Sequence, residues 1–257
     1  MGERYDRAVT IYSPDGHLLQ VEYAQEAVRK GSTAVGLRTD DCILLGVERK
    51  TAGDLQEERS IRKIRLLDDH VIMTFAGLTA DARIVCNRAQ TEAQSHRLNF
   101  ERAVSVDYIS RYVAELQQKY TQSNGCRPFG VSCLIGGFDD NGKPHLYQTE
   151  PSGICYEWVA AATGRHGQSV RGFLEKHGDG HSVGKSLNEE TAIKEVVRTM
   201  ITVTPMGQSQ FDVAVLKYDQ PLRMVDRQIV ADYVGVIEKQ NELEARNAQQ
   251  LNNLTQS

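Results

Sequence analysis

The chain has 257 residues, of which 40% are hydrophobic and 25% are charged, and its formal net charge is -4. This hydrophobic share can fill a substantial core, so the length suits one large domain or two small ones. The low net charge gives no broad field that would draw the chain to nucleic acid or to an anionic membrane, and we expect neither as a partner.

Short β-prone runs follow the first thirty residues and come in pairs joined by aspartate-containing turns. The expected strands of this first group are Thr33–Arg38, Cys42–Glu48, Lys63–Leu67 and Val71–Phe75. Two helices are expected next, over Thr79–Leu98 and Val106–Gln122. In the second helix Tyr108, Tyr112, Leu116 and Tyr120 recur at every fourth position, which predicts one face that packs into the core.

The second half of the chain repeats this alternation. Strands are expected at Gly130–Phe138, His145–Thr149 and Ile154–Ala162, then helices at Gln168–His177 and Asn188–Thr204, then strands at Phe211–Tyr218 and Leu222–Val225. The run from Asp139 to Gly142 indicates a tight hairpin. A charged helix is expected from Asp226 to about Asn247.

Groups of strands followed by groups of helices favour antiparallel sheets. Two such sheets stacked face to face, each covered outside by a helix pair, would bury both faces of every strand. The sequence therefore predicts an α+β fold, a four-layer αββα sandwich, in one domain.

The first thirty residues have a different character. Tyr12–Gly16 is expected to form a turn and His17–Lys30 a helix, with Gly31 as a left-handed cap. This helix has no evident place inside the sandwich, so we expect an external element that serves a neighbour. The chain then divides into an arm and helix at 1–31, a core domain at 32–240 and a polar tail at 241–257.

The cysteines are five in number and are too widely scattered for a zinc motif. We expect reduced thiols of an intracellular protein, with no metal and no cofactor. The sequence contains neither a long apolar run nor the apolar core of a signal peptide, so we expect neither a membrane span nor secretion.

The N-terminal segment carries a dense set of characteristic residues, namely Tyr5, Thr10, Tyr12–Pro14, Gly16–His17, Gln20–Ala24 and Ala27. This set resembles the N-terminal signature of proteasome α subunits. The resemblance continues through Lys30–Gly36, Arg62–Ile64, Leu67–Asp69, Ala76–Arg83 and Arg127–Gly130. Gly31–Gly36, Gln94–Leu98, Tyr120–Gly125 and Leu146–Thr149 are most similar to the α type-7 subunits of eukaryotes, which occupy the fourth ring position. The polar end from Gln249 departs from the lysine-rich tail of that group.

The resemblance implies an N-terminal nucleophile hydrolase fold and a non-catalytic subunit of a threonine-type endopeptidase complex, the 20S proteasome. The implied partners are neighbouring α subunits in a heteroheptameric ring, β-ring subunits, and regulatory particles or other activators. The implied process is ubiquitin-dependent protein degradation, in the cytoplasm and the nucleus.

Catalytic relatives in this fold use a threonine whose free α-amino group is the general base. Their pattern places Ser32 at the nucleophile position, Glu48 near the acidic partner and Lys63 near the catalytic lysine. Since Ser32 still follows thirty-one residues, we expect no catalysis. A self-processing hydrolase would need cleavage after Gly31. A free-standing binding module is a second alternative.

The resemblance also assigns two sites. Tyr5, Asp6, Pro14 and Tyr23 are the positions that cluster when the pore gate of such a ring opens. Lys63 is the position whose ammonium receives the terminal carboxylate of an activator, in a pocket that Gly31 and Leu78 line. A lysine suits this role because it presents a point cation to a carboxylate.

Overall fold

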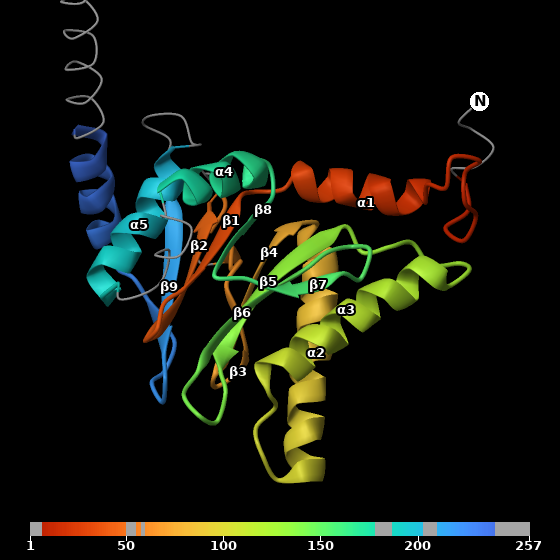
Figure 1. Ribbon diagram of the computed structural model, residues 1–257, viewed down its shortest axis with the longest axis horizontal. Coiled ribbons are helices and arrows are strands. Elements are labelled where there is room, and N and C mark those ends of the chain that lie inside the picture. The colour runs from red at the N-terminus through yellow and green to blue at the C-terminus, as the bar shows by residue number, and fades with distance from the viewer. Residues whose placement is uncertain (1–6, 50–54, 58–59, 178–186, 203–209, 240–257) are drawn as a thin grey trace, which may run out of the picture.

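The computed structural model describes residues 7–49, 55–57, 60–177, 187–202 and 210–239 (Figure 1). Tyr5, Asp6 and the predicted polar tail lie outside these residues. Within them, no helix combines the length and the apolar character that crossing a bilayer requires.

Two antiparallel sheets form the centre of the molecule. The first has the strand order β10-β9-β2-β1-β8 and the second β3-β4-β5-β6-β7. The strands of the first sheet are β1 (Ala34–Arg38), β2 (Cys42–Glu48), β8 (Ala160–Thr163), β9 (Phe211–Lys217) and β10 (Arg223–Met224). Those of the second are β3 (Arg65–Asp68), β4 (Val71–Gly77), β5 (Val131–Phe138), β6 (Pro144–Thr149) and β7 (Cys155–Glu157).

The central strands are buried on both faces, as their continuous apolar sequences require. In β2, Ile43 and Leu45 join the apolar cluster that lies between the two sheets. Leu44, which points to the opposite face, joins the cluster beneath the helices. Alternate side chains thus fill two layers of core, and the predicted αββα sandwich is confirmed.

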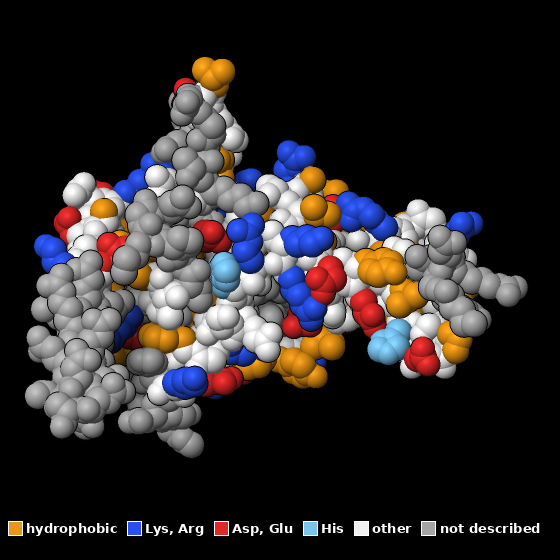
Figure 2. All heavy atoms as spheres, turned by 90° about the horizontal axis from the view of Figure 1, so that it is seen from above, with side chains coloured by type: hydrophobic (Ala, Val, Ile, Leu, Met, Phe, Trp, Pro, Cys, Tyr) orange, Lys and Arg blue, Asp and Glu red, His pale blue; other side chains and the backbone are white. Residues whose placement is uncertain are grey.

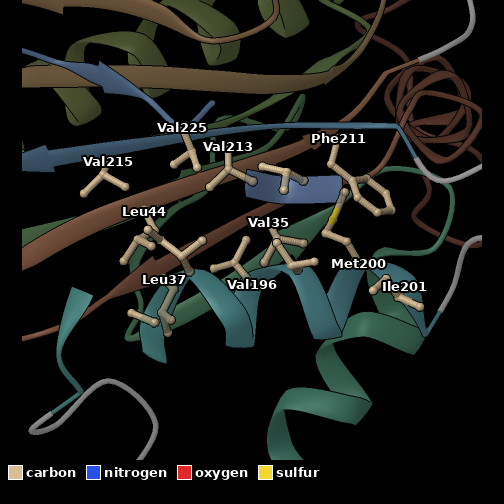
Figure 3. Packing of buried hydrophobic residues seen from close by; sticks show 14 of the residues in the cluster. Val35, Leu37, Leu44, Val196, Met200, Ile201, Phe211, Val213, Val215 and Val225 are labelled. Atoms are coloured by element: carbon tan, nitrogen blue, oxygen red, sulfur yellow. The ribbon is translucent and has the colours of Figure 1, made fainter. Parts of the chain in front are cut away.

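Two helices cover each outer face. They are α2 (Thr79–Phe100) and α3 (Val106–Gln122) over the second sheet, and α4 (Gly167–His177) and α5 (Glu189–Ile201) over the first. Residues 227–239 form a further helix. Figure 3 shows how α5 packs, with Val196 and Met200 directed at Leu44 and Val213 of the first sheet.

The predicted single strand Ile154–Ala162 is wrong. The chain instead leaves one sheet as β7 and enters the other as β8. Between them the Trp158 N–H donates to Leu146 O at 2.8 Å, and Val159 O accepts from the Arg38 N–H at 2.8 Å. The apolar run therefore bridges the two layers.

The predicted tyrosine face of α3 is also partly wrong. Ile109 and Val113 are fully buried, as is Val106, and Leu116 is buried beside them. Tyr112 and Tyr120 pack at the edge of that core, whereas Tyr108 is 42% exposed. A tyrosine ring suits the edge of a core because its hydroxyl can stay in water.

Helix α1 (Leu19–Arg29) lies across one end of the sandwich, beside α4 (Figure 1). Its Val21, Ala24 and Val28 are buried and it contacts β4 and β5. One side of α1 is therefore part of the packing of this chain, while Tyr23 on another side is 49% exposed.

Candidate functional site

A groove of about 850 Å³ lies beside the C-terminal end of α1. It is lined by Gln56 and by three stretches: the end of α1, residues 60–65, and the junction of β4 with α2. Lys63, Gly31 and Leu78, which the sequence predicted to share a pocket, all line this groove. The structure thus brings together three residues that are far apart in the sequence.

The floor of the groove is made of main chain. A Cβ atom on Gly31 would lie 2.3 Å from Gly77 N, and a Cβ atom on Gly77 would lie 2.1 Å from Gly130 O. The Leu78 N–H donates to Gly130 O at 2.9 Å. Only glycine permits such an approach of three backbone segments.

The predicted left-handed cap at Gly31 is wrong. The C-cap of α1 is Lys30, with right-handed backbone angles (φ −85°, ψ −8°). The Lys30 N–H donates to Glu26 O at 3.1 Å, and the Gly31 N–H donates to Val28 O at 2.8 Å. The glycine is needed at position 31 for space against Gly77, since its own φ is not in the left-handed region.

An ion pair fixes the N-terminal turn of α2 above this floor. The Asp81 carboxylate, 5% exposed, accepts from Arg127 Nη1 at 2.6 Å and Nη2 at 2.7 Å, and from Gly130 N at 3.0 Å. Burial alone would raise the pKa of Asp81, but these hydrogen bonds outweigh it and hold the pKa below its ordinary 3.8. The two family-like stretches Ala76–Arg83 and Arg127–Gly130 are therefore one structural unit.

The rim of the groove is strongly cationic. Its described lining contains five cationic residues and no aspartate or glutamate, and the cations are Lys30, Arg62, Lys63, Arg65 and Arg83. Leu78, the N-cap of the 22-residue helix α2, makes no side-chain capping hydrogen bond. The first N–H groups of α2 therefore add a partial positive charge at the same place. Such a site suits a carboxylate.

Of these cations, Lys63 was predicted to line the pocket, whereas Arg62, Arg65 and Arg83 were not. Arg83 lies four residues after Thr79 on α2, and so on the same face of that helix as the groove-lining first turn. Only the juxtaposition of α2 with residues 60–65 distinguishes these arginines from ordinary surface charges.

The nucleophile position cannot act as one here. The Ser32 hydroxyl is buried and has no hydrogen-bond partner among the described residues. Its backbone nitrogen is in a peptide bond with Gly31, so the free amine that would serve as general base is missing. The Glu48 carboxylate accepts from the Thr33 N–H at 3.0 Å, and it therefore binds main chain.

The turn before α4 holds this segment in place. Gly164 has φ +96°, and a Cβ atom there would lie 2.4 Å from Ser32 O. The next residue, Arg165, donates its N–H to Gly31 O at 3.0 Å. The turn thus allows the two chain segments to approach each other closely.

Of the predicted gate residues, the structure describes Pro14 and Tyr23, and both are exposed. Pro14 lies in the predicted turn, where the Gly16 N–H donates to Ser13 O at 2.9 Å and Gly16 has φ +81°. Tyr5 and Asp6 lie outside the described residues, so the structure describes only two of the four predicted gate residues.

The fold is a four-layer sandwich with an N-terminal helix across one end, and its nucleophile position is buried and peptide-bonded. These features define a non-catalytic member of the N-terminal nucleophile hydrolase fold. Comparison with known families agrees with this class. Residues 28–216 match the proteasome subunit family, and residues 5–27 match the N-terminal signature of A-type proteasome subunits. The chain belongs to the proteasome α-subunit family.

Curated relatives of this chain include α type-7 subunits and an α type-8 subunit. The chain is 62% identical to the proteasome alpha type-7-1B subunit of Drosophila melanogaster, over 95% of this chain and 96% of the relative. It is 58% identical to the alpha type-7-1 subunit of the same organism, over 97% and 99%. It is 52% identical to the alpha type-8 subunit of Mus musculus, over 94% and 96%. The predicted similarity to α type-7 subunits is confirmed.

Membership of this family gives the general function of the chain. Alpha-type subunits form the non-catalytic ring of the proteasome, so this chain is a non-catalytic α subunit of the 20S core that assembles with other proteasome subunits in a ring.

Proposed function

We propose that this subunit receives the C-terminus of a proteasome activator in the groove beside α1 and contributes its N-terminal arm to the substrate gate. It occupies the fourth position of a heteroheptameric ring that contacts the β ring. The particle is a threonine-type endopeptidase that degrades ubiquitin-tagged proteins in the cytoplasm and the nucleus.

The observation that carries the docking proposal is the convergence of Lys63, Gly31 and Leu78 on one groove. A terminal carboxylate in this groove gains the Lys63 ammonium and the positive end of α2 together. The backbone floor lets an extended peptide approach closely. The fixed Asp81–Arg127 pair keeps the helix N-terminus in position, which lowers the entropic cost of binding.

The gate proposal is supported by how the arm is attached. Val21, Ala24 and Val28 anchor α1 on the sandwich, and the hydrogen-bonded turn from Ser13 to His17 sets the direction of the chain before it. A tyrosine ring that packs on a proline, together with a hydrogen bond between a phenol and a carboxylate, makes only a few contacts. Such a small number of contacts can form and break as the gate opens and closes.

A Lys63→Ala substitution in assembled particles tests the docking proposal. Loss of a charged hydrogen-bond donor is expected to weaken binding of a single activator tail about 10- to 100-fold. The tail should be used as a free peptide, because a complete activator docks through several tails and avidity would mask the loss.

Arg88→Ala is the matched control, since it removes one exposed cation of α2 that does not line the groove. Ring assembly should be intact in both variants. Equal affinity of the tail for the Lys63→Ala and wild-type particles would contradict the docking proposal.

Two alternatives make different predictions. A self-processing hydrolase needs cleavage after Gly31, which would remove α1 from the sandwich that it packs against. A free-standing binding module would be monomeric, whereas native mass spectrometry should show this chain in a particle of many different subunits.

A further inference from the structure

Asparagine is followed directly by glycine at two places in the chain, Asn124 with Gly125 and Asn141 with Gly142. Such a pair favours deamidation of the asparagine. Glycine has no side chain to shield its amide nitrogen, and its backbone freedom lets this nitrogen reach the asparagine side-chain carbonyl. The reaction is fastest where the glycine nitrogen is not held in a hydrogen bond, and the structure separates the two places on this point.

The turn that follows α3 leaves the reacting atoms of Asn124 accessible. Asn124 and Gly125 are both exposed, and a Cβ atom on Gly125 (φ +80°) would meet nothing within 4 Å. The hydrogen bond that closes the turn runs from the Cys126 N–H to Ser123 O at 3.4 Å. The Gly125 N–H has no hydrogen-bond partner within the described part of the chain. Its nitrogen can therefore approach the Asn124 side chain.

The hairpin at Asn141 holds the same atoms in place. The Gly142 N–H donates to Asp139 O at 2.8 Å. The Tyr218 hydroxyl donates to Asp140 O at 2.9 Å, and a Cβ atom on Gly142 would lie 3.5 Å from the Tyr218 ring. Attack by the Gly142 nitrogen requires the hydrogen bond to Asp139 to break first. Asn141 is therefore a protected site and a control within the same chain.

Asn124 also holds the N-terminal arm. The Thr10 hydroxyl donates to Asn124 Oδ1 at 3.3 Å, although the two residues are far apart in the sequence. In Figure 1 the segment before α1 lies beside the loop that follows α3, at one end of the molecule. Figure 2, which views the face that carries α1, shows this end as a projection from the broader body. The arm is thus linked to a turn whose chemistry favours deamidation.

We propose that Asn124 is a site of spontaneous deamidation and that its conversion to isoaspartate releases the arm at Thr10. The Gly125 nitrogen loses its proton and bonds to Asn124 Cγ, and the side-chain nitrogen leaves as ammonia. Water then adds to one of the two carbonyl carbons of the cyclic imide, and the bond from that carbon to the Gly125 nitrogen breaks. Hydrolysis at the main-chain carbon gives isoaspartate, and hydrolysis at Cγ gives aspartate.

The two products differ in what they present to Thr10. In isoaspartate Cγ stays bonded to the Gly125 nitrogen, so the main chain of the turn gains one methylene group. The oxygen that accepted from Thr10 becomes a main-chain carbonyl oxygen and is drawn into the turn, away from the arm. Aspartate keeps the original main chain and an acceptor oxygen at the same place, so it retains the link.

The modification is tested by ageing the full-length chain at neutral pH. Peptide mass spectrometry, with fragmentation that distinguishes isoaspartate from aspartate, follows both asparagines. Asn124 should convert at least about two- to tenfold faster than Asn141, because the hydrogen bond of Gly142 has to break first. Asn124→Gln should suppress conversion at position 124, since the longer side chain has to close a larger ring. Equal rates at Asn124 and Asn141, or no conversion of Asn124, would overturn the proposal.

Release of the arm is measured by limited cleavage with trypsin after Arg7, which is exposed. Chains with isoaspartate at position 124 should be cut about two- to tenfold faster than fresh chains, because cleavage follows the fraction of molecules with a free arm. Asn124→Asp, which keeps the acceptor, should be cut at the wild-type rate. Thr10→Val, which removes the donor, should be cut as fast as the isoaspartate form. Equal cleavage of the fresh and isoaspartate forms would show that the arm is not released. The measurement is of access to the arm, so its outcome does not depend on the proposed gate function.

Discussion

Replacing Asp81 by asparagine tests the ion pair that holds the first turn of α2. The wild-type carboxylate is 5% exposed and accepts three hydrogen bonds, two from Arg127 and one from Gly130 N. Asparagine has one acceptor oxygen and presents an NH₂ group to the remaining donors. Charged hydrogen bonds contribute about 1.5 to 3 kcal/mol each. Because Arg127 is 63% exposed and can regain water, we expect a total loss of about 2 to 3 kcal/mol.

The loss should depend on pH with a definite sign. The folded-state pKa of Asp81 lies below its ordinary 3.8, so the stabilisation is fully present above that value and is lost as the pH falls through the lower folded pKa. Urea unfolding of the full chain, followed by the fluorescence of its one tryptophan, Trp158, gives the free energy of unfolding. The difference between wild type and Asp81→Asn should be largest near neutral pH and should narrow below 3.8.

Asp69→Asn is the control, because that carboxylate is 84% exposed and its loss should cost less than about 0.5 kcal/mol. The proposed energetics of the Asp81–Arg127 pair would be refuted by either of two results. One is a decrease in the free energy of unfolding of Asp81→Asn as small as that of the control, and the other is a decrease of equal size in acid and at neutral pH.

Two further predictions concern the packing of the groove floor and the N-terminus of the chain in assembled particles. Gly77→Ala should destabilise the chain by about 3 kcal/mol, because it adds a clash with Gly130 O to an unfavourable positive φ. Gly125→Ala, at a similar positive φ in open space, should cost only about 1 kcal/mol, and equal costs in urea unfolding would show that the floor is not tightly packed. Intact mass and N-terminal sequencing of this chain from assembled particles should find residues before Ser32 retained, and a terminus at Ser32 or Thr33 would be incompatible with a non-catalytic role.

The alternation of strands and helices made the layers predictable. A strand such as β2, apolar along nearly its whole length, has to be buried on both faces, and only a stacked arrangement provides that. The crossing at Trp158 was not predictable in this way, because an apolar run looks the same whether it continues in one sheet or bridges two. The cap at Gly31 was mispredicted for a related reason, since a glycine needed for space cannot be told from one needed for a positive φ.

The candidate site was predictable only through the family resemblance. That resemblance pointed to Lys63, Gly31 and Leu78 as one pocket, and the structure places all three in one groove. The arginines of the rim carry no such signal. Arg62 and Arg83 are exposed residues of a type common on surfaces, and their shared location depends on tertiary packing that no local pattern encodes.

The groove floor, built from the main chain at Gly31 and Gly77 and packed against Gly130 O, has a consequence for how the members of such a ring differ from one another. A surface of peptide groups keeps its shape and its hydrogen-bonding character whatever side chains surround it. Ring members can therefore share this floor and differ only at rim positions such as Arg62 and Arg83. If the groove receives activator tails as proposed, an activator with several tails then has one orientation on the ring in which each tail meets the rim that suits it.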